Sequence, residues 1–207
     1  MSSRGPRDKG SRKGRTLILR VAYYLFLIAG IVGLGYAGYV IADAYTYQRV
    51  EQSTFENASK NNNARRHEPT HAVREGGVIG ELEVPRLGLK VVVVQGDTAT
   101  ILQRAVGHLI ETALPGEPGN VILAGHRDRF FRPLRYIHSG DVILVKTLDG
   151  DFQYQVESTT VVPPSDLSVL QPSNVGVLTL ITCFPFYYVG PAPNRFVVRA
   201  RQVTSVD

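Results

Sequence analysis

The chain has 207 residues, of which 43% are hydrophobic and 20% are charged, and this balance excludes a disordered or fibrous protein. The net charge of +5 does not indicate a nucleic-acid-binding domain, because the first twenty residues carry seven basic residues and one acidic residue. The rest of the chain therefore sums to about −1, whereas a DNA-binding domain carries its basic surface on the fold itself. The basic residues of this segment are Arg4, Arg7, Lys9, Arg12, Lys13, Arg15 and Arg20.

Residues 21–42 form a run of 22 residues without a charge. As a helix this run would be about 33 Å long, which matches a bilayer hydrocarbon core of about 30 Å, so we expect a single N-terminal transmembrane helix. The alternative is a signal peptide cleaved near Ala42-Asp43-Ala44, but the apolar segment of a signal peptide is usually shorter. The basic residues 1–20 predict a cytoplasmic tail, so the chain from residue 43 onward is expected outside the cell membrane.

Residues 43–77 are polar and unpatterned, which predicts an extracytoplasmic tether that is partly helical near the membrane. The folded domain is expected over residues 78–207, where short apolar runs are separated by turns. The candidate strands are 78–84, 90–94, 121–124, 142–147, 152–160, 177–182 and 195–202. Helical patterning is confined to 98–105 and 131–136, and Asp149-Gly150 predicts a hairpin. The domain is therefore expected to be mostly β, a compact barrel or sandwich of about 130 residues.

Cys183 is the only cysteine, so the chain cannot form an internal disulfide. A lone cysteine is often a small buried hydrophobic residue. This one, however, ends the apolar run 177–182 and precedes Phe184-Pro185, where a strand must stop because proline cannot donate to the ladder. Arg195 opens the next candidate strand. If the two strands are neighbours, the thiol and the cation lie at the same end of the sheet, a setting that favours a reactive thiolate.

A thiol nucleophile needs a proton partner, and the chain has five histidines. His67 and His71 lie in the polar tether and His138 lies in a turn, so all three are expected to be exposed. His126 follows the apolar run 120–124, and strand-end loops are where catalytic side chains concentrate. His108 has no such strand before it. The pattern favours His126 as the partner of the thiol but leaves His108 open.

The sequence Thr-Leu-Ile-Thr-Cys at 179–183, with Arg195 twelve residues later, resembles the sortase signature TLxTC…R. The segment NVILAGHR at 120–127 resembles the one that carries the catalytic histidine of that family. The sequences CFPFYYVGPAP at 183–193 and FFRPL at 130–134 are most like those of class D sortases. The resemblance covers residues 78–203 and implies an eight-stranded sortase barrel. It also implies that Cys183 is the nucleophile, His126 the acid/base partner and Arg195 the anion stabiliser.

The resemblance further implies a substrate and a reaction. Secreted proteins with a C-terminal LPxTG- or LPxTA-like sorting motif would be cleaved after Thr through a Cys thioacyl intermediate. They would then be transferred to an amine acceptor, either a cell wall precursor or another protein of the envelope. No cofactor is expected. Some sortases bind calcium, but Glu81, Glu83, Asp97 and Asp128 form no recognisable ligand loop, so they are interpreted as scattered surface carboxylates.

Substrate contacts are expected mainly in the aromatic loop after Cys183, which suits a groove for the Leu and Pro of the motif. The same rings would equally cover the end of a barrel. The candidate contacts are His108, Thr182, Phe184, Tyr187 and Tyr188. Of these, His108 matches a Gly-His position for which the resemblance implies a structural or substrate-side role.

Three rival functions are left: a cysteine hydrolase, an L,D-transpeptidase-like cell-wall enzyme and a non-catalytic surface binding domain. The Ser-His-Gly-Cys motif of L,D-transpeptidases is absent, because Thr182 precedes Cys183. An amine acceptor separates a transpeptidase from a hydrolase, since only the transpeptidase makes a ligated product. Thiol reactivity separates either enzyme from a binding domain.

Overall fold

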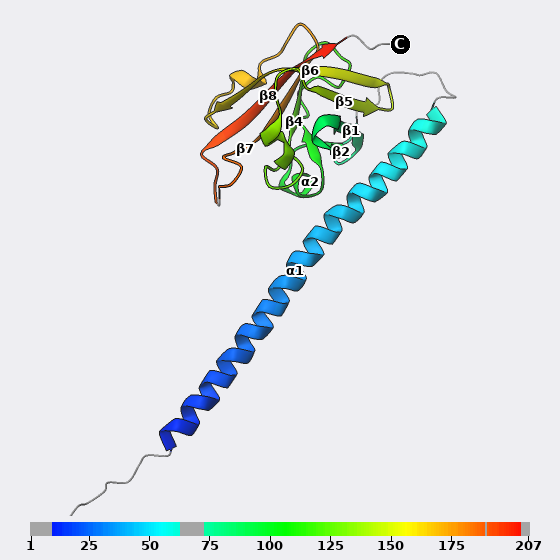
Figure 1. Ribbon diagram of the computed structural model, residues 1–207. Helices are drawn as coiled ribbons and strands as arrows, with labels where there is room; N and C mark the ends of the chain where they lie inside the picture. The colour runs from blue at the N-terminus through cyan, green and yellow to red at the C-terminus, as the bar shows by residue number, and fades with distance from the viewer. Residues whose placement is uncertain (1–9, 63–72, 189, 204–207) are drawn as a thin grey trace, which may run out of the picture. The chain divides into compact units, whose positions relative to one another are not determined.

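The computed structural model describes residues 10–62, 73–188 and 190–203. The chain divides into two compact units, residues 1–43 and 44–207. A helix of 53 residues, α1 (Gly10–Asn62), forms the described part of the first unit and continues into the second (Figure 1). Within the described residues, one segment, Leu19–Thr54, is long and apolar enough to cross a membrane, and its most apolar window is entirely unburied. This confirms the apolar N-terminal helix expected from the sequence.

Much of the segment predicted as a tether is helical. α1 runs without a break to Asn62, and residues 43–62 contain neither glycine nor proline that would interrupt a helix. The rest of the predicted tether includes residues 63–72, which lie outside the described residues, as do His67 and His71. The first strand then begins at Val78, the residue at which the folded domain was predicted to start.

Eight strands form a closed barrel within the described residues, in the order β1-β2-β3-β4-β7-β8-β6-β5 (Figure 1). The strands are β1 (Val78–Val84), β2 (Leu89–Gln95), β3 (Val106–His108), β4 (Asn120–Ala124), β5 (Val142–Thr147), β6 (Asp151–Val162), β7 (Val177–Phe184) and β8 (Asn194–Val203). β2 pairs with β3 and β4 with β7 in parallel, and all other neighbours are antiparallel. The predicted mostly-β barrel is confirmed, and a barrel leaves no open sheet edge.

The sequence-based elements match this fold except at one strand. All seven predicted strands are present, and the hairpin at Asp149-Gly150 joins β5 to β6. The three-residue strand β3 was not predicted, because it is too short to show an alternating pattern. His108 therefore does end a strand, contrary to the expectation. The predicted helical segments correspond to α2 (Ala99–Arg104) and the 3-10 helix η2 (Arg132–Tyr136); η1 (Pro85–Leu87) and η3 (Ser168–Leu170) are further 3-10 turns.

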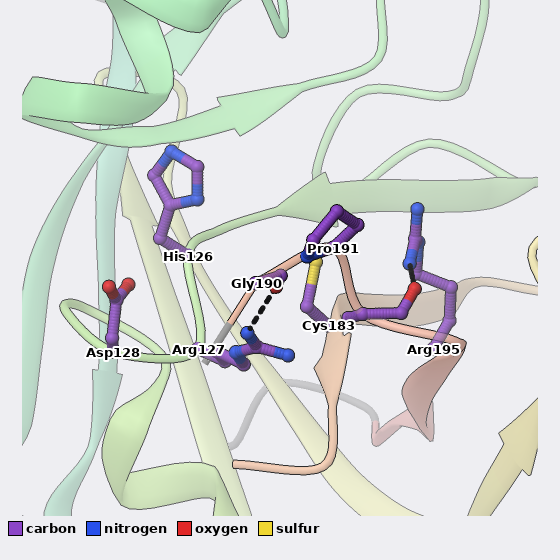
Figure 2. A pocket seen from close by; sticks show the side chains of 8 residues that line it. His126, Arg127, Asp128, Cys183, Gly190, Pro191 and Arg195 are labelled. Carbon is purple, nitrogen blue, oxygen red and sulfur yellow. Dashed lines mark hydrogen bonds between the residues drawn. The ribbon is translucent and has the colours of Figure 1, made fainter. Parts of the chain in front are cut away.

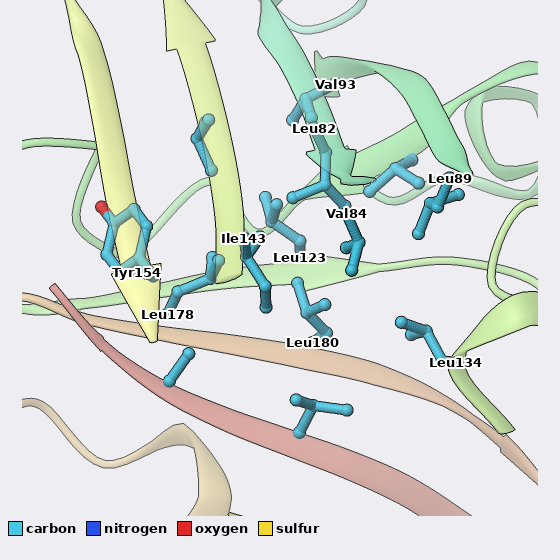
Figure 3. Packing of buried hydrophobic residues seen from close by; sticks show 14 of the residues in the cluster. Leu82, Val84, Leu89, Val93, Leu123, Leu134, Ile143, Tyr154, Leu178 and Leu180 are labelled. Atoms are coloured by element: carbon cyan, nitrogen blue, oxygen red, sulfur yellow. The ribbon is translucent and has the colours of Figure 1, made fainter. Parts of the chain in front are cut away.

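The interior of the barrel is filled mainly by aliphatic side chains, with contributions from all eight strands (Figure 3). Leu82 and Val84 from β1, Leu123 from β4, and Leu178 and Leu180 from β7 are all fully buried. Burying a side chain of this size is worth roughly 1.5–3 kcal/mol. The packed interior therefore fixes the ends of β4 and β7, which carry the residues considered below.

The second unit includes the C-terminal part of α1, which contacts the outside of the barrel. The Gln48 side chain accepts a hydrogen bond from the Val92 N–H at 3.0 Å and donates one to the Arg104 carbonyl at 2.6 Å. Tyr47 packs against the cluster of Val92, Val94 and Ala105. Part of the predicted tether therefore covers an apolar outer face of β2 rather than acting only as a spacer.

Candidate active site

Cys183 and Arg195 are directly opposite each other in the antiparallel pair β7–β8. Directly opposed residues project their side chains to the same face of a sheet. Both residues are partly buried. Arg195 Nη1 donates to the carbonyls of Asn194 and Ala192 at 3.2 and 3.4 Å. The expectation that the thiol and the guanidinium meet at one end of the sheet is confirmed by this register.

His126 is brought to the same place by the parallel pair β4–β7. Ala124 pairs with Ile181, so Gly125 and His126 leave the sheet beside Thr182 and Cys183. The strand ends are joined by two further hydrogen bonds: Gly125 N–H donates to the Ile181 carbonyl at 3.2 Å, and the Thr182 hydroxyl donates to the Gly125 carbonyl at 2.7 Å. The residue after Gly125, which is His126, therefore emerges next to the strand end that carries Cys183.

Position 125 requires glycine because the ring of Phe131 packs directly against it. A Cβ atom at this position would lie 2.8 Å from Cδ2 of Phe131. Phe131 is fully buried, and its N–H donates to the His126 carbonyl at 3.1 Å. The loop after β4 thus folds back on itself, and this turn fixes the backbone that carries His126.

Cys183, His126 and Arg195 all line one pocket of about 370 Å³. Figure 2 shows Cys183 with His126 on one side of it and Arg195 on the other. The lining residues are His126, Arg127, Asp128, Cys183, Gly190, Pro191, Ala192 and Arg195. The structure therefore brings a thiol, an imidazole and a guanidinium into one pocket, which is the set of groups needed for nucleophilic acyl transfer with anion stabilisation.

Arg127 is a residue of this pocket that sequence reasoning missed. Its Nη2 donates to the carbonyls of Tyr188 and Gly190, at 2.6 and 3.0 Å, in the loop between β7 and β8. Its guanidinium carbon lies 5.7 Å from the centre of the Tyr188 ring. The only sign in the sequence was its place directly after His126, and that does not predict backbone carbonyls as its partners.

The candidate substrate residues divide into buried and exposed groups. Thr182 is 3% exposed and its hydroxyl donates a hydrogen bond to the Gly125 carbonyl, which gives Thr182 a structural role. Phe184 stacks on Phe196 with ring centroids 6.3 Å apart, as expected for rings that cover the end of a barrel. Tyr187 and Tyr188, in contrast, are 76% and 47% exposed. Of this group, only the two tyrosines present a substantial open surface.

His108 is fully buried and lies apart from the pocket residues. Its Nδ1 is 2.9 Å from Oε1 of Gln95, and its Nε2 is 2.9 Å from the Ala113 carbonyl oxygen and 3.1 Å from the Thr112 hydroxyl. Burial lowers the pKa of His108, so the neutral imidazole is favoured. These contacts give His108 a structural role, and they lend no support to the substrate contact expected from the sequence.

Two of the four carboxylates considered for calcium pair with lysine side chains. Glu81 lies 3.2 Å from the Lys90 ammonium and Glu83 lies 2.8 Å from that of Lys146. Within the described residues, no group of three or more His, Cys, Asp or Glu side chains is arranged to hold a metal ion. His138 is exposed, as its turn predicted.

The comparisons with known proteins agree with one another. The family model of the sortase domain matches residues 82–203. Sortase D from Bacillus subtilis (strain 168) is 31% identical over 194 residues, which cover 87% of this chain and 97% of that protein. The solved structure of a Clostridium perfringens Sortase D5 transpeptidase aligns with a TM-score of 0.63 and 26% identity, covering 78% of this chain and 99% of that one.

A structure of Clostridium perfringens sortase C with the C-terminal cell wall sorting motif aligns with a TM-score of 0.60 and 26% identity. The alignment covers 80% of this chain and 90% of that chain. The family-model match to residues 82–203 takes in most of the barrel and includes the strands that carry Cys183 and Arg195.

Proposed function

The chain belongs to the sortase family of cysteine transpeptidases, and from that premise we propose that Cys183, His126 and Arg195 are its catalytic residues. The observation that carries the proposal is the cross-strand pair of Cys183 and Arg195 in a pocket shared with His126. The substrates are secreted proteins with a C-terminal LPxTG- or LPxTA-like sorting motif. The product is the same protein joined to an amine acceptor of the cell envelope.

In the first half of the reaction, the Cys183 thiolate attacks the carbonyl carbon of the motif's Thr. The bond from that carbon to the following nitrogen breaks, and the protonated His126 gives its proton to the departing amine. In the second half, the acceptor amine attacks the thioester, neutral His126 takes its proton, and the thiolate leaves. The thioester conserves the energy of the acyl bond, so neither ATP nor a cofactor is needed.

Arg195 stabilises the oxyanion that forms in both halves. Its hydrogen bonds to described residues all come from Nη1, which donates to the carbonyl of Ala192 just before β8 and to that of Asn194 at the start of β8. This anchoring leaves Nε and Nη2 of the planar fork for the developing anion. Removing one preorganised donor of this kind costs about 10²–10³ in kcat.

Residues 21–42 of α1 are the membrane anchor in this proposal, with residues 1–20 in the cytoplasm and the barrel outside. This location suits an enzyme whose substrates are exported proteins. The exposed rings of Tyr187 and Tyr188 form the rim on which the apolar Leu and Pro of the motif rest. A sorting motif accompanies the related Clostridium perfringens sortase C in its structure, which supports the assignment of this substrate class.

The test uses the full chain in detergent micelles with LPxTG- and LPxTA-type peptides, with and without an amine acceptor. Mass spectrometry is expected to find a thioacyl adduct on Cys183 and an amine-dependent ligated peptide. Cys183→Ala should abolish both products. Arg195→Met should lower kcat/KM by about 10²–10³, whereas Arg199→Met, a matched loss of charge further along β8, should change it by less than about twofold.

Two other outcomes would replace the proposal. Cleavage without ligation, even with the amine present, would make the protein a cysteine hydrolase. Absence of both products, together with a Cys183 that resists a small alkylating agent, would make it a surface binding domain.

A further inference from the structure

Arg127 joins two loops that meet at the pocket. It directly follows His126 on the loop after β4, while its hydrogen-bond acceptors lie in the described residues 185–188 and 190–193, here named the β7–β8 loop. Figure 2 shows the guanidinium reaching the Gly190 carbonyl beside Cys183. Because both acceptors are backbone carbonyls, the contact specifies the path of the loop and does not depend on its side chains.

One of the two carbonyls that Arg127 holds, that of Gly190, belongs to a residue that lines the pocket. Gly190, Pro191 and Ala192 line the pocket together with Cys183. Gly190 has a φ of +108°, a conformation that other residues rarely adopt, so this part of the loop has a specified shape. A guanidinium that fixes the carbonyl of Gly190 therefore also fixes the residues that follow it in the wall.

Near its start the loop is held by Phe186, which packs against the barrel core and the ring of Phe196, and the contacts further along it are weaker than those of Arg127. Arg135 lies 5.2 Å from the ring of Tyr187, a residue that is 76% exposed. Arg195 reaches the Ala192 carbonyl at 3.4 Å. The charged hydrogen bonds of Arg127, at 2.6 and 3.0 Å, are shorter than this and therefore stronger.

One nitrogen of the Arg127 guanidinium has no hydrogen-bond partner among the described residues. Arg127 Nη1 is buried and makes no hydrogen bond to any described residue. A buried donor without an acceptor is uncommon in a protein.

We propose that Arg127 is a positioning residue of the sortase reaction, which holds the β7–β8 loop as the substrate-facing wall of the pocket. The inference rests on the function proposed above and adds a residue to it. Without Arg127, the loop samples other conformations, and a binding peptide has to order it. Substrate binding is therefore weakened more than the chemical step, because Cys183 and Arg195 remain on β7 and β8 and His126 remains on the turn that follows β4.

The experiment compares the full-length wild-type chain in detergent micelles with Arg127→Met, Arg127→Lys and the control Arg129→Met. Arg129 lies in the same loop, carries the same charge and also donates to a carbonyl, that of Gln103 at 2.7 Å, away from the pocket. Steady-state ligation of a sorting peptide should show KM raised at least tenfold and kcat lowered less than threefold in Arg127→Met. Arg127→Lys should recover part of the loss, and Arg129→Met should stay within about twofold of wild type.

Two measurements without a substrate separate this inference from the proposed function. Hydrogen exchange of the β7–β8 loop should be at least tenfold faster in Arg127→Met than in Arg129→Met. The pH profile for alkylation of Cys183 by iodoacetamide should be the same in both. If the wild-type protein ligates no peptide, the proposed function fails, while the exchange data still decide the role of Arg127.

Two results would overturn the inference. Loop exchange and KM in Arg127→Met that match those of Arg129→Met would show that Arg127 does not hold the loop. A shifted alkylation profile with unchanged loop exchange would show that Arg127 acts on the charge state of the thiol instead. If Arg127→Met does not fold, the same comparison between Arg127→Lys and Arg129→Met gives the answer.

Discussion

The pocket around Cys183 has two walls of different construction. One consists of the ends of β4, β7 and β8, whose backbone groups are paired in the barrel and whose apolar side chains are buried in the core. The other is the β7–β8 loop, where Tyr187 and Tyr188 are exposed and arginine side chains supply the contacts described above. The groups proposed for chemistry lie on or next to the first wall, and the groups that shape the opening lie on the second.

This difference indicates that the strand wall holds the groups proposed for catalysis and that the loop wall shapes the opening for the peptide. Catalytic groups must be held within a fraction of an ångström, which a packed sheet does better than a loop. Loops that shape a binding site come from the less stable parts of a protein, so this one depends on specific contacts such as those of Arg127 to keep its shape. Changes in the strand wall should therefore alter folding, and changes in the loop wall should alter binding.

The largest expected effect comes from the core beneath the strand wall. Leu180→Ala removes a fully buried side chain from β7 and should lower the free energy of unfolding by about 2–5 kcal/mol. The matched change in the loop, Tyr187→Ala, removes a larger but 76% exposed side chain and should cost less than about 0.5 kcal/mol. Urea unfolding followed by tyrosine fluorescence measures both, since the chain has no tryptophan. Equal losses would mean that the loop is as much a part of the folded core as β7 is.

A smaller effect is expected where the strand wall meets the His126 loop. Thr182→Val removes the hydroxyl that donates to the Gly125 carbonyl and leaves a buried acceptor unpaired, which should cost about 1–3 kcal/mol. Thr182→Ser keeps the hydroxyl and should recover most of the loss. The unfolding measurement above provides the values. If Thr182→Val instead kept full stability and raised only KM for the peptide, Thr182 would be a substrate contact, as the sequence first indicated.

Much of the strand wall could be predicted from the sequence, because its signals are local. A run of apolar residues ended by Cys183 and Phe184-Pro185 gives both the strand and its end, and the next strand opens at Arg195. Adjacency of consecutive strands then places the two residues together, as the observed register confirms. The role of His108 was harder to assign, because it depends on burial between Gln95 and Ala113, and neither contact is visible in a local pattern.

The loop wall could not be predicted in the same way. Its shape depends on hydrogen bonds from Arg127 to backbone carbonyls more than sixty residues away along the chain, and a carbonyl has no residue identity to recognise. The length of α1 was missed for a different reason. Residues 43–62 are polar and show no apolar stripe, so they resemble a linker, although nothing in them opposes a helix.

The smallest effect is expected at Asp141, at the base of the connection that leads from His126 to β5. Arg86 from η1 donates to both of its carboxylate oxygens, at 2.5 and 2.6 Å, and the His138 N–H donates to one of them at 2.8 Å. These hydrogen bonds, chiefly those from Arg86, lower the pKa of Asp141. The carboxylate therefore stabilises the fold fully above the pKa of the unfolded chain, about 4, and this contribution is lost as the pH falls through the lower folded value.

Asp141→Asn should accordingly lower Tm at pH 7, and its difference from wild type should shrink as the pH is lowered from about 4. Asp97→Asn, a change of an exposed aspartate outside this cluster, should leave Tm nearly unchanged at both pH values. Thermal unfolding of the full chain at a series of pH values provides the comparison. A difference that stayed constant down to pH 2 would mean that Asp141 acts through its shape or packing and not through its charge. Because Asp141 lies at the end of the connection from His126 to β5 and does not line the pocket, ligation at pH 7 should change less in this variant than in Arg127→Met.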